Sequence, residues 1–563
     1  MLVLVFLPLG VISAPRKHYP GEIIVAYADY VKNPFLRTSF IKFSDDYYCK
    51  RTNYQKVHFR YSIGDRIIGK KFKDIGLQFS FRKNINFTLC DFKSLNEKKL
   101  LFKKLINSNY NLELLVDDIV VNMPFGIFLN NSYFMFSKYE FTFYHNDNVI
   151  SDVKVTPMTV RNLMSNNVLS VRVTSKWKET LSSREEMKYK KLKIINYHSA
   201  HMFSIIYLVV LFIVFCLLLL KINRGIKLDS KTSYDEKQFD DFDFPTNRGW
   251  KMVHSDVFRP EKGSSLLFQL VGSGLQFFTI ILLYTFINIF TSYDKKHDYE
   301  INLFLVLFVV TTLISSFISV YTSNVFGRKK WLRIAFGSSY ILPALIIICW
   351  ICISIIGRKY HSFYCLRIFS FILILLILIL PVGLLSIFGG LQAYKKKDID
   401  ESGSVALVPR MIPKLPLLLK TFPLSIGFTL LLSPVFLCEL SIIFKGIWGN
   451  LSYVDYKYLI LVLILIVILT FEYSNICTFF GLQKEYYLWQ WRTFFIPIPS
   501  GAFSFGLSLF IFHEEYLNNL FSTSFFIIVN LVISLVLSMI LGSISYLSSL
   551  YSLKRLYSNI KSD

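Results

Sequence analysis

The stretch MFSIIYLVVLFIVFCLLLL (Met202–Leu220) contains no charged residue and divides the chain into two parts of different composition. At a helical rise of 1.5 Å per residue, it is long enough to cross a hydrocarbon layer about 30 Å thick. Residues 15–200 before it mix polar and apolar positions, whereas the sequence after it consists mostly of long apolar blocks. We therefore predict a soluble N-terminal domain joined to a membrane domain.

The overall composition agrees with a membrane protein. The chain has 563 residues, of which 53% are hydrophobic, and its mean hydropathy is +0.45. A soluble domain needs more polar residues to cover its surface. The net charge of +24 would suggest a nucleic-acid partner in a soluble protein. Because no basic-aromatic motif or nucleic-acid module is visible, we expect no nucleic-acid partner.

Nine apolar blocks are long enough to span a bilayer. The first forms a transmembrane helix over 201–220, and the other eight form a membrane domain over 266–548. Prolines interrupt the sixth and eighth blocks, which membrane helices tolerate when neighbouring groups satisfy the freed carbonyls. The blocks lie near 202–220, 266–290, 301–326, 334–356, 366–390, 421–443, 457–480, 494–512 and 523–548.

The distribution of basic residues predicts the orientation of these helices. If the N-terminus is lumenal, the cytosolic segments carry 24 lysines and arginines, and the lumenal loops, counted with their boundary residues, carry 7. Basic residues accumulate on the cytosolic side of membrane proteins. We therefore expect a lumenal N-terminus, a cytosolic loop over 221–265 and a cytosolic tail over 549–563.

The N-terminal part begins with a short apolar run over 1–14 that ends in small residues, which is typical of a signal peptide. Over 15–200, short β-branched and aromatic runs alternate with turn residues, and this pattern predicts a β-rich, sandwich-like lumenal domain of antiparallel strands. One segment, EKKLLFKKLI (97–106), is a plausible helix.

Several residues of this part are candidates for covalent modification. Asn86 and Asn130 lie in glycosylation sequons, and Asn450 lies in a third that the predicted topology also places in the lumen. Cys49 and Cys90 are the two cysteines of the N-terminal domain, so we expect a disulfide between them in an oxidising compartment. Cys365 is a competitor, because it is also lumenal in this topology.

Four ordered stretches carry a resemblance to a known family. They are GWKMVHSDVFRP (249–260) continuing into GSGLQFF (272–278), PRMIP (409–413), EYYLWQWRTFF (485–495) and the terminal KSD (561–563). In a nine-span frame they resemble the nonaspanins, the transmembrane 9 superfamily. The resemblance implies a Golgi and endosomal membrane protein that sorts or localises other membrane proteins. It also implies that Lys561 and Asp563 form a sorting signal read by a coat protein, coatomer.

Two motifs have a structural and a functional interpretation. Gly272, Ser273 and Gly274 begin the second span, where small residues let helices approach closely; helix packing is the favoured interpretation and a groove for the helices of cargo proteins is the alternative. Trp489, Trp491 and Arg492 lie at a membrane boundary. We interpret them as ordinary interfacial anchors, and coupling of the cytosolic loops is the alternative.

Two carboxylates, Glu439 and Glu472, fall inside the sixth and seventh spans. A carboxylate at this depth usually faces the bundle interior or a water cavity. We favour a helix–helix contact, but an ion or small-solute transporter that uses both residues is the alternative function. No phosphate loop, nucleophile elbow or metal-ligand spacing is present. We therefore expect no enzyme activity and no cofactor.

Overall fold

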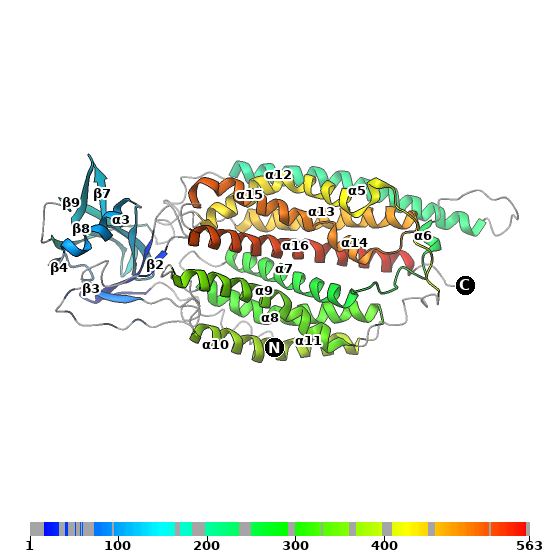
Figure 1. The fold of residues 1–563 in the computed structure, drawn as a ribbon, viewed down its shortest axis with the longest axis horizontal. Helices are drawn as coiled ribbons and strands as arrows, with labels where there is room; N and C mark the ends of the chain where they lie inside the picture. Colours follow the sequence, from blue (N-terminus) through cyan, green and yellow to red (C-terminus); the bar gives the residue numbers. More distant parts are fainter. Residues whose placement is uncertain are drawn as a thin grey trace.

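The computed structural model has a β-domain at one end of a long helical bundle (Figure 1). It describes residues 16–32, 40–42, 51, 54, 57, 59, 72–92, 95–107, 109–163, 169–182, 198–235, 249–290, 299–327, 330–359, 368–396, 408–448, 456–516 and 520–558.

The β-domain contains two five-stranded sheets among its described residues. One sheet has the order β2-β1-β5-β6 with β3 also paired to β1, and the other has the order β4-β10-β8-β7 with β9 also paired to β8. The strands are β1 (Ile23–Lys32), β2 (Phe40–Lys42), β3 (Lys73–Ser80), β4 (Asn86–Phe92), β5 (Asn111–Val116), β6 (Ile119–Pro124), β7 (Gly126–Leu129), β8 (Ser132–Asn146), β9 (Val149–Asn162) and β10 (Leu169–Glu179).

The two sheets share one apolar core. Phe79 of β3 lies 4.9 Å and 5.0 Å from the rings of Phe141 and Phe143 of β8, measured between ring centroids. The predicted sandwich-like domain and its helix, α3 (Leu95–Asn107), are therefore present. One detail of the prediction is wrong: β10 pairs with β8 in parallel, not antiparallel. Local sequence patterns do not reveal the direction of a partner strand that is distant in the chain.

Nine helical segments of the described chain are long and apolar enough to span a membrane, as predicted. They are Ser199–Leu228, Ser264–Phe290, Asn302–Val325, Trp331–Arg358, Phe371–Lys395, Thr421–Phe444, Tyr456–Gln483, Gln490–Ile511 and Thr523–Tyr557. The helices that carry them are α5 (His198–Asp235), α7 (Ser264–Phe290), α8 (Tyr299–Val325), α9 (Trp331–Lys359), α10 with α11 (Ile368–Ile377, Gly383–Lys395), α12 (Thr421–Trp448), α13 (Tyr456–Gln483), α14 with α15 (Gln490–Phe495, Ile498–Tyr516) and α16 (Leu520–Tyr557).

Prolines affect these helices unequally. Pro434 lies inside α12, which remains one helix. Pro497 separates α14 from α15, so the eighth span consists of two helical pieces. Pro381 lies in a five-residue π-helical turn, Leu378–Val382, between α10 and α11. A proline removes one backbone hydrogen bond, and the surrounding bundle determines whether the helix continues.

The helices pack around α7, which contacts α8, α9, α13 and α16. The first span, α5, lies at the periphery against α12 and α13. Only 11% of the most apolar 18 residues of this span are buried. Two helices extend beyond the predicted spans. Helix α5 continues to Asp235, into the predicted loop. Helix α16 continues to Tyr557, so the first residues of the predicted tail are helical, and Leu550, Leu553 and Tyr557 are buried against the bundle.

Candidate functional site

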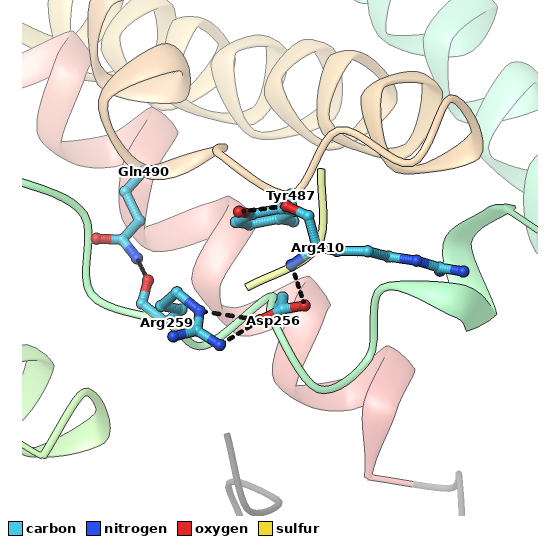
Figure 2. Close-up of polar contacts among 5 residues, drawn as sticks. All are labelled: Asp256, Arg259, Arg410, Tyr487 and Gln490. Atoms are coloured by element: carbon cyan, nitrogen blue, oxygen red, sulfur yellow. Dashed lines mark hydrogen bonds and ion pairs between the residues drawn. The ribbon is translucent and has the colours of Figure 1, made fainter. Parts of the chain in front are cut away.

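Three of the four family-like stretches meet at the end of the bundle opposite the β-domain. We call this region the motif junction and define it as residues 249–262, 408–413 and 485–495. Its first stretch begins with the short helix α6 (Gly249–Met252) and leads into α7, and its last stretch contains α14. Figure 2 shows five polar residues of the junction, which come from all three stretches.

Asp256 is the central acceptor of the motif junction. Its side chain is 4% exposed, and its Oδ1 accepts hydrogen bonds from Arg259 Nε at 2.9 Å and Nη2 at 2.6 Å. Its Oδ2 lies 3.3 Å from the backbone nitrogen of Arg410, which donates to it (Figure 2). Arg410 also donates from Nη1 to the Met252 carbonyl at 2.7 Å, and its own carbonyl accepts from the Tyr487 hydroxyl at 3.1 Å. The three stretches are therefore connected through charged and backbone groups.

Gln490 and Glu261 make a second, reciprocal connection. The Gln490 backbone N–H donates to Glu261 Oε1 at 2.8 Å, and the Glu261 N–H donates to Gln490 Oε1 at 3.4 Å. Gln490 Nε2 also donates to the Arg259 carbonyl at 2.7 Å. Burial raises the pKa of the Glu261 carboxyl above its ordinary value of 4.5, although backbone hydrogen bonds from Gln490 and Trp491 oppose the shift. Glu261 is thus a half-buried acceptor that fixes the start of α14.

The residues predicted as interfacial anchors bind protein groups in the junction. Trp489 is 1% exposed, its Nε1–H donates to the Val257 carbonyl at 2.9 Å, and its ring stacks on Tyr546 of α16. Half-buried Trp491 donates to the Lys262 carbonyl at 3.0 Å. Arg492 is 6% exposed and donates from Nη2 to the Leu419 carbonyl at 2.7 Å. The alternative interpretation, coupling of the loops, fits these contacts better than anchoring in headgroups.

The end of α16 completes the junction. The Tyr557 hydroxyl donates to the Trp250 carbonyl at 2.7 Å, and Ser545 donates to the Thr493 carbonyl at 2.7 Å. The junction therefore joins the ends of α7, α13, α14 and α16. Its signal in the sequence was the presence of three ordered motifs in loops at one end of the predicted bundle.

Gly272, Ser273 and Gly274 are buried in α7. A Cβ on Gly272 would lie 2.7 Å from the Ser315 carbonyl oxygen of α8 and 2.9 Å from Ser338 Cβ of α9. A Cβ on Gly274 would clash with the Met539 carbonyl oxygen of α16. The protein's own helices therefore occupy the space beside both glycines, which agrees with the helix-packing interpretation.

Glu439 and Glu472 lie in different surroundings. Glu439 is 4% exposed and pairs with His201 of α5, whose Nδ1 lies 2.9 Å from Oε2, and the ring of Tyr458 stacks on His201. Glu472 is 5% exposed, and its Oε2 has no hydrogen-bond partner among the described residues. Sequence reasoning identified both carboxylates but not the partner His201, which is 238 positions away from Glu439.

The remaining candidates are exposed or lie outside the described residues. Asn86 is exposed at the start of β4, and Asn130 is exposed in the turn between β7 and β8. The segment 1–14 and the residues Cys49, Cys365, Asn450, Lys561 and Asp563 lie outside the described part, so the predictions for the signal peptide, the disulfide with Cys90 and the sorting signal stay predictions. Within the described part, no group of three or more His, Cys, Asp or Glu residues could hold a metal ion.

Comparison with known proteins identifies the family. The endomembrane protein 70 family matches residues 41–523. Transmembrane 9 superfamily member 4 of Arabidopsis thaliana is 28% identical over 88% of this chain and 86% of its own length. The putative phagocytic receptor 1b of Dictyostelium discoideum is 26% identical over 86% and 85%, and transmembrane 9 superfamily member 1 of Mus musculus is 24% identical over 90% and 88%. No solved structure matches the chain. The chain thus belongs to the endomembrane protein 70 family, the transmembrane 9 superfamily of multi-pass membrane proteins.

Proposed function

We propose that this protein sorts or localises other membrane proteins in the Golgi and endosomal membranes. The observation that carries the proposal is the motif junction, in which the family-like stretches lock helix ends together through hydrogen bonds. Such a junction holds the helices of the bundle in one arrangement. A membrane scaffold that recognises the helices of other proteins requires such a fixed arrangement. In this proposal the protein is not an enzyme.

The proposed topology places the β-domain in the lumen and the motif junction in the cytosol. The contact between His201 and Glu439 supports one part of this proposal: it joins the start of α5, which follows the β-domain, to the later part of α12. Asn450, which follows α12, then lies on the same side as Asn86 and Asn130. Glycans on these asparagines and a disulfide between Cys49 and Cys90 belong to the same proposal.

The experiment compares the surface proteome and the Golgi proteome of cells with and without this protein. Mislocalised membrane proteins that return on re-expression of the wild-type chain would support the proposal. An Asp256→Ala chain should rescue poorly, and a Glu485→Ala chain should rescue well, because the ion pair of Glu485 with Arg410, at 3.9 Å, is exposed. An unchanged distribution of membrane proteins in depleted cells would contradict the proposal.

The proposed partner at the C-terminal tail is coatomer, through Lys561 and Asp563. The test is the location of Lys561→Ala and Asp563→Ala chains together with binding of coatomer to the tail. Location and binding identical to the wild type would contradict this part, without affecting the sorting role.

One observation favours a second candidate, transport of an ion or small solute. Glu472 keeps a buried carboxylate oxygen without a hydrogen-bond partner in the described structure, and such groups mark ion pathways in other membrane proteins. Flux through liposomes that contain the purified protein, lost in Glu472→Gln, would support transport over sorting.

A further inference from the structure

The segment VPRMIPKLPLLLK (Val408–Lys420) has an unusual surface. We call it the rim segment. Its residues 408–413 belong to the motif junction, and it ends directly before α12. Its only regular structure is a short 3-10 turn, Leu417–Leu419. It contains three prolines and three basic residues, and no acidic residue occurs between Ser402 and Cys438. The rim segment is therefore basic, apolar and largely extended.

The backbone of the rim segment is fixed to the bundle at two places. Near its start, the Arg410 N–H donates to Asp256, and the Arg410 carbonyl accepts from Tyr487. Near its end, the Leu419 carbonyl accepts from Arg492 at 2.7 Å. Since Arg492 lies in the first turn of the eighth span, these contacts hold the end of the rim segment beside the start of that span.

Large apolar side chains of the rim segment are exposed: Val408 is 80% exposed, Met411 94%, Leu417 70% and Leu418 77%. Exposed apolar side chains continue into α12, where Phe422 is 74% exposed and Leu430 is 65% exposed. In a membrane-spanning helix such an apolar face contacts lipid. The rim segment therefore extends the lipid-facing surface of α12 outward from its first residue.

We propose that the rim segment lies in the interface of the leaflet at this end of the bundle and binds anionic phospholipid. Met411, Leu417 and Leu418 enter the region between headgroups and acyl chains, as the apolar residues of interfacial segments do. Lys414 and Lys420, both exposed, attract the phosphate and carboxylate groups of anionic lipids. A proline-binding protein fits less well, because the backbone at both ends of the segment is already held by the bundle.

The experiment uses the full-length protein in nanodiscs of phosphatidylcholine, with or without phosphatidylserine. The environment-sensitive amino acid Anap is placed at position 411, or at position 484 as the control. Lys484 is exposed at the same end of the bundle, between α13 and α14. We expect the probe at 411, but not at 484, to emit at shorter wavelength and to be quenched by lipids spin-labelled near the headgroup. Phosphatidylserine should increase both effects.

Charge variants separate the lipid contact from folding. For the probe at 411, each of Lys414→Gln and Lys420→Gln should reduce the increase in blue shift and quenching that phosphatidylserine causes by about fivefold. Lys484→Gln should leave that increase unchanged. Salt at about 1 M, where the Debye length is about 3 Å, should have the same effect as the two lysine variants together.

Two outcomes would overturn the proposal. One is a probe at 411 that reports water in both kinds of nanodisc, as the probe at 484 does. The other is a wavelength shift that appears only after soluble cytosolic proteins are added, which would identify a protein as the occupant.

Discussion

The β-domain and the helical bundle both bury aromatic side chains, such as Phe79 and Phe268, but they differ in the small polar side chains that they bury. The β-domain packs aromatic rings between its sheets, and Phe79, Phe81, Phe141 and Phe143 are completely buried there. In the bundle, many completely buried residues are small and polar, among them Ser273, Ser315, Ser319 and Ser338. Large apolar residues such as Phe422 and Leu430 are instead exposed on the bundle surface.

The difference reflects the surroundings in which each part folds. Water favours burial of large apolar surface. In lipid an exposed leucine costs nothing, so close helix approach and hydrogen bonds decide the packing. Ser319 illustrates this, because its hydroxyl donates to Ser338 of α9 at 3.1 Å and removes a polar group from lipid.

The largest effect is expected in the β-domain. Phe79→Ala should reduce its free energy of unfolding by about 3–5 kcal/mol, because it leaves a cavity between the sheets. Hydrogen exchange of the strand amides in the full-length protein measures this loss. Leu181→Ala, at a position that is 98% exposed, is the control and should change little. Equal effects of the two variants would mean that the sheets do not share this core.

The next largest effect is expected in the motif junction. Asp256→Ala leaves Arg259 and the Arg410 N–H without their acceptor and should destabilise the bundle by about 2–3 kcal/mol. The matched control Glu485→Ala breaks an exposed pair and should cost about 0–1 kcal/mol. Thermal unfolding in detergent distinguishes the two, and the junction would not be a stabilising element if Asp256→Ala unfolded like the wild type.

A smaller effect tests the packing in lipid. Gly274→Ala places a methyl group against the Met539 carbonyl of α16 and should cost about 1–3 kcal/mol through overpacking. The control is Gly506→Ala in α15, where nothing lies within 4 Å of the added Cβ; it should be neutral or slightly stabilising. Thermal unfolding of the two variants in the same detergent gives the comparison, and a tolerated alanine at 274 would contradict close approach of α7 and α16.

The smallest effect concerns pH. Because burial raises the pKa of Glu261 in the folded state above 4.5, the folded protein binds more protons than the unfolded chain in that range. The contribution of Glu261 to the free energy of unfolding is therefore most favourable below the ordinary pKa of the carboxyl. This contribution is lost as pH rises through the pKa of the folded state. Glu261→Gln keeps the acceptor for Gln490 and should remove this part of the pH dependence, a difference of less than about 1 kcal/mol. Unfolding curves from pH 4 upward check it, and identical pH dependence in both proteins would refute it.

The sequence predicted each element that has a strong local signal. Long apolar runs such as Met202–Leu220 revealed all nine spans, because crossing a bilayer requires such a run. The end of α16 was missed although Leu550, Leu553 and Tyr557 have helical spacing, since polar residues between them lower the hydropathy. An amphipathic search past residue 548 would have found it.

The contacts of the candidate site were harder to predict. The sequence identified the three motifs but did not show that Asp256, Arg410 and Tyr487 meet, because contacts between loops depend on how the helices assemble. For the same reason it gave no partner for Glu439, and it suggested a headgroup position for Trp489, which is buried in protein.

The pairing of His201 with Glu439 also bears on the order in which the chain is made. The two residues are 238 positions apart, so at about 5–20 residues per second the ribosome adds Glu439 roughly 10–50 s after His201. Throughout that interval α5 stands in the membrane without α12 and α13. The most apolar 18 residues of its span have a mean hydropathy of 3.2, and only 11% of them are buried even in the finished fold. The helix is therefore stable in lipid before α12 and α13 are made.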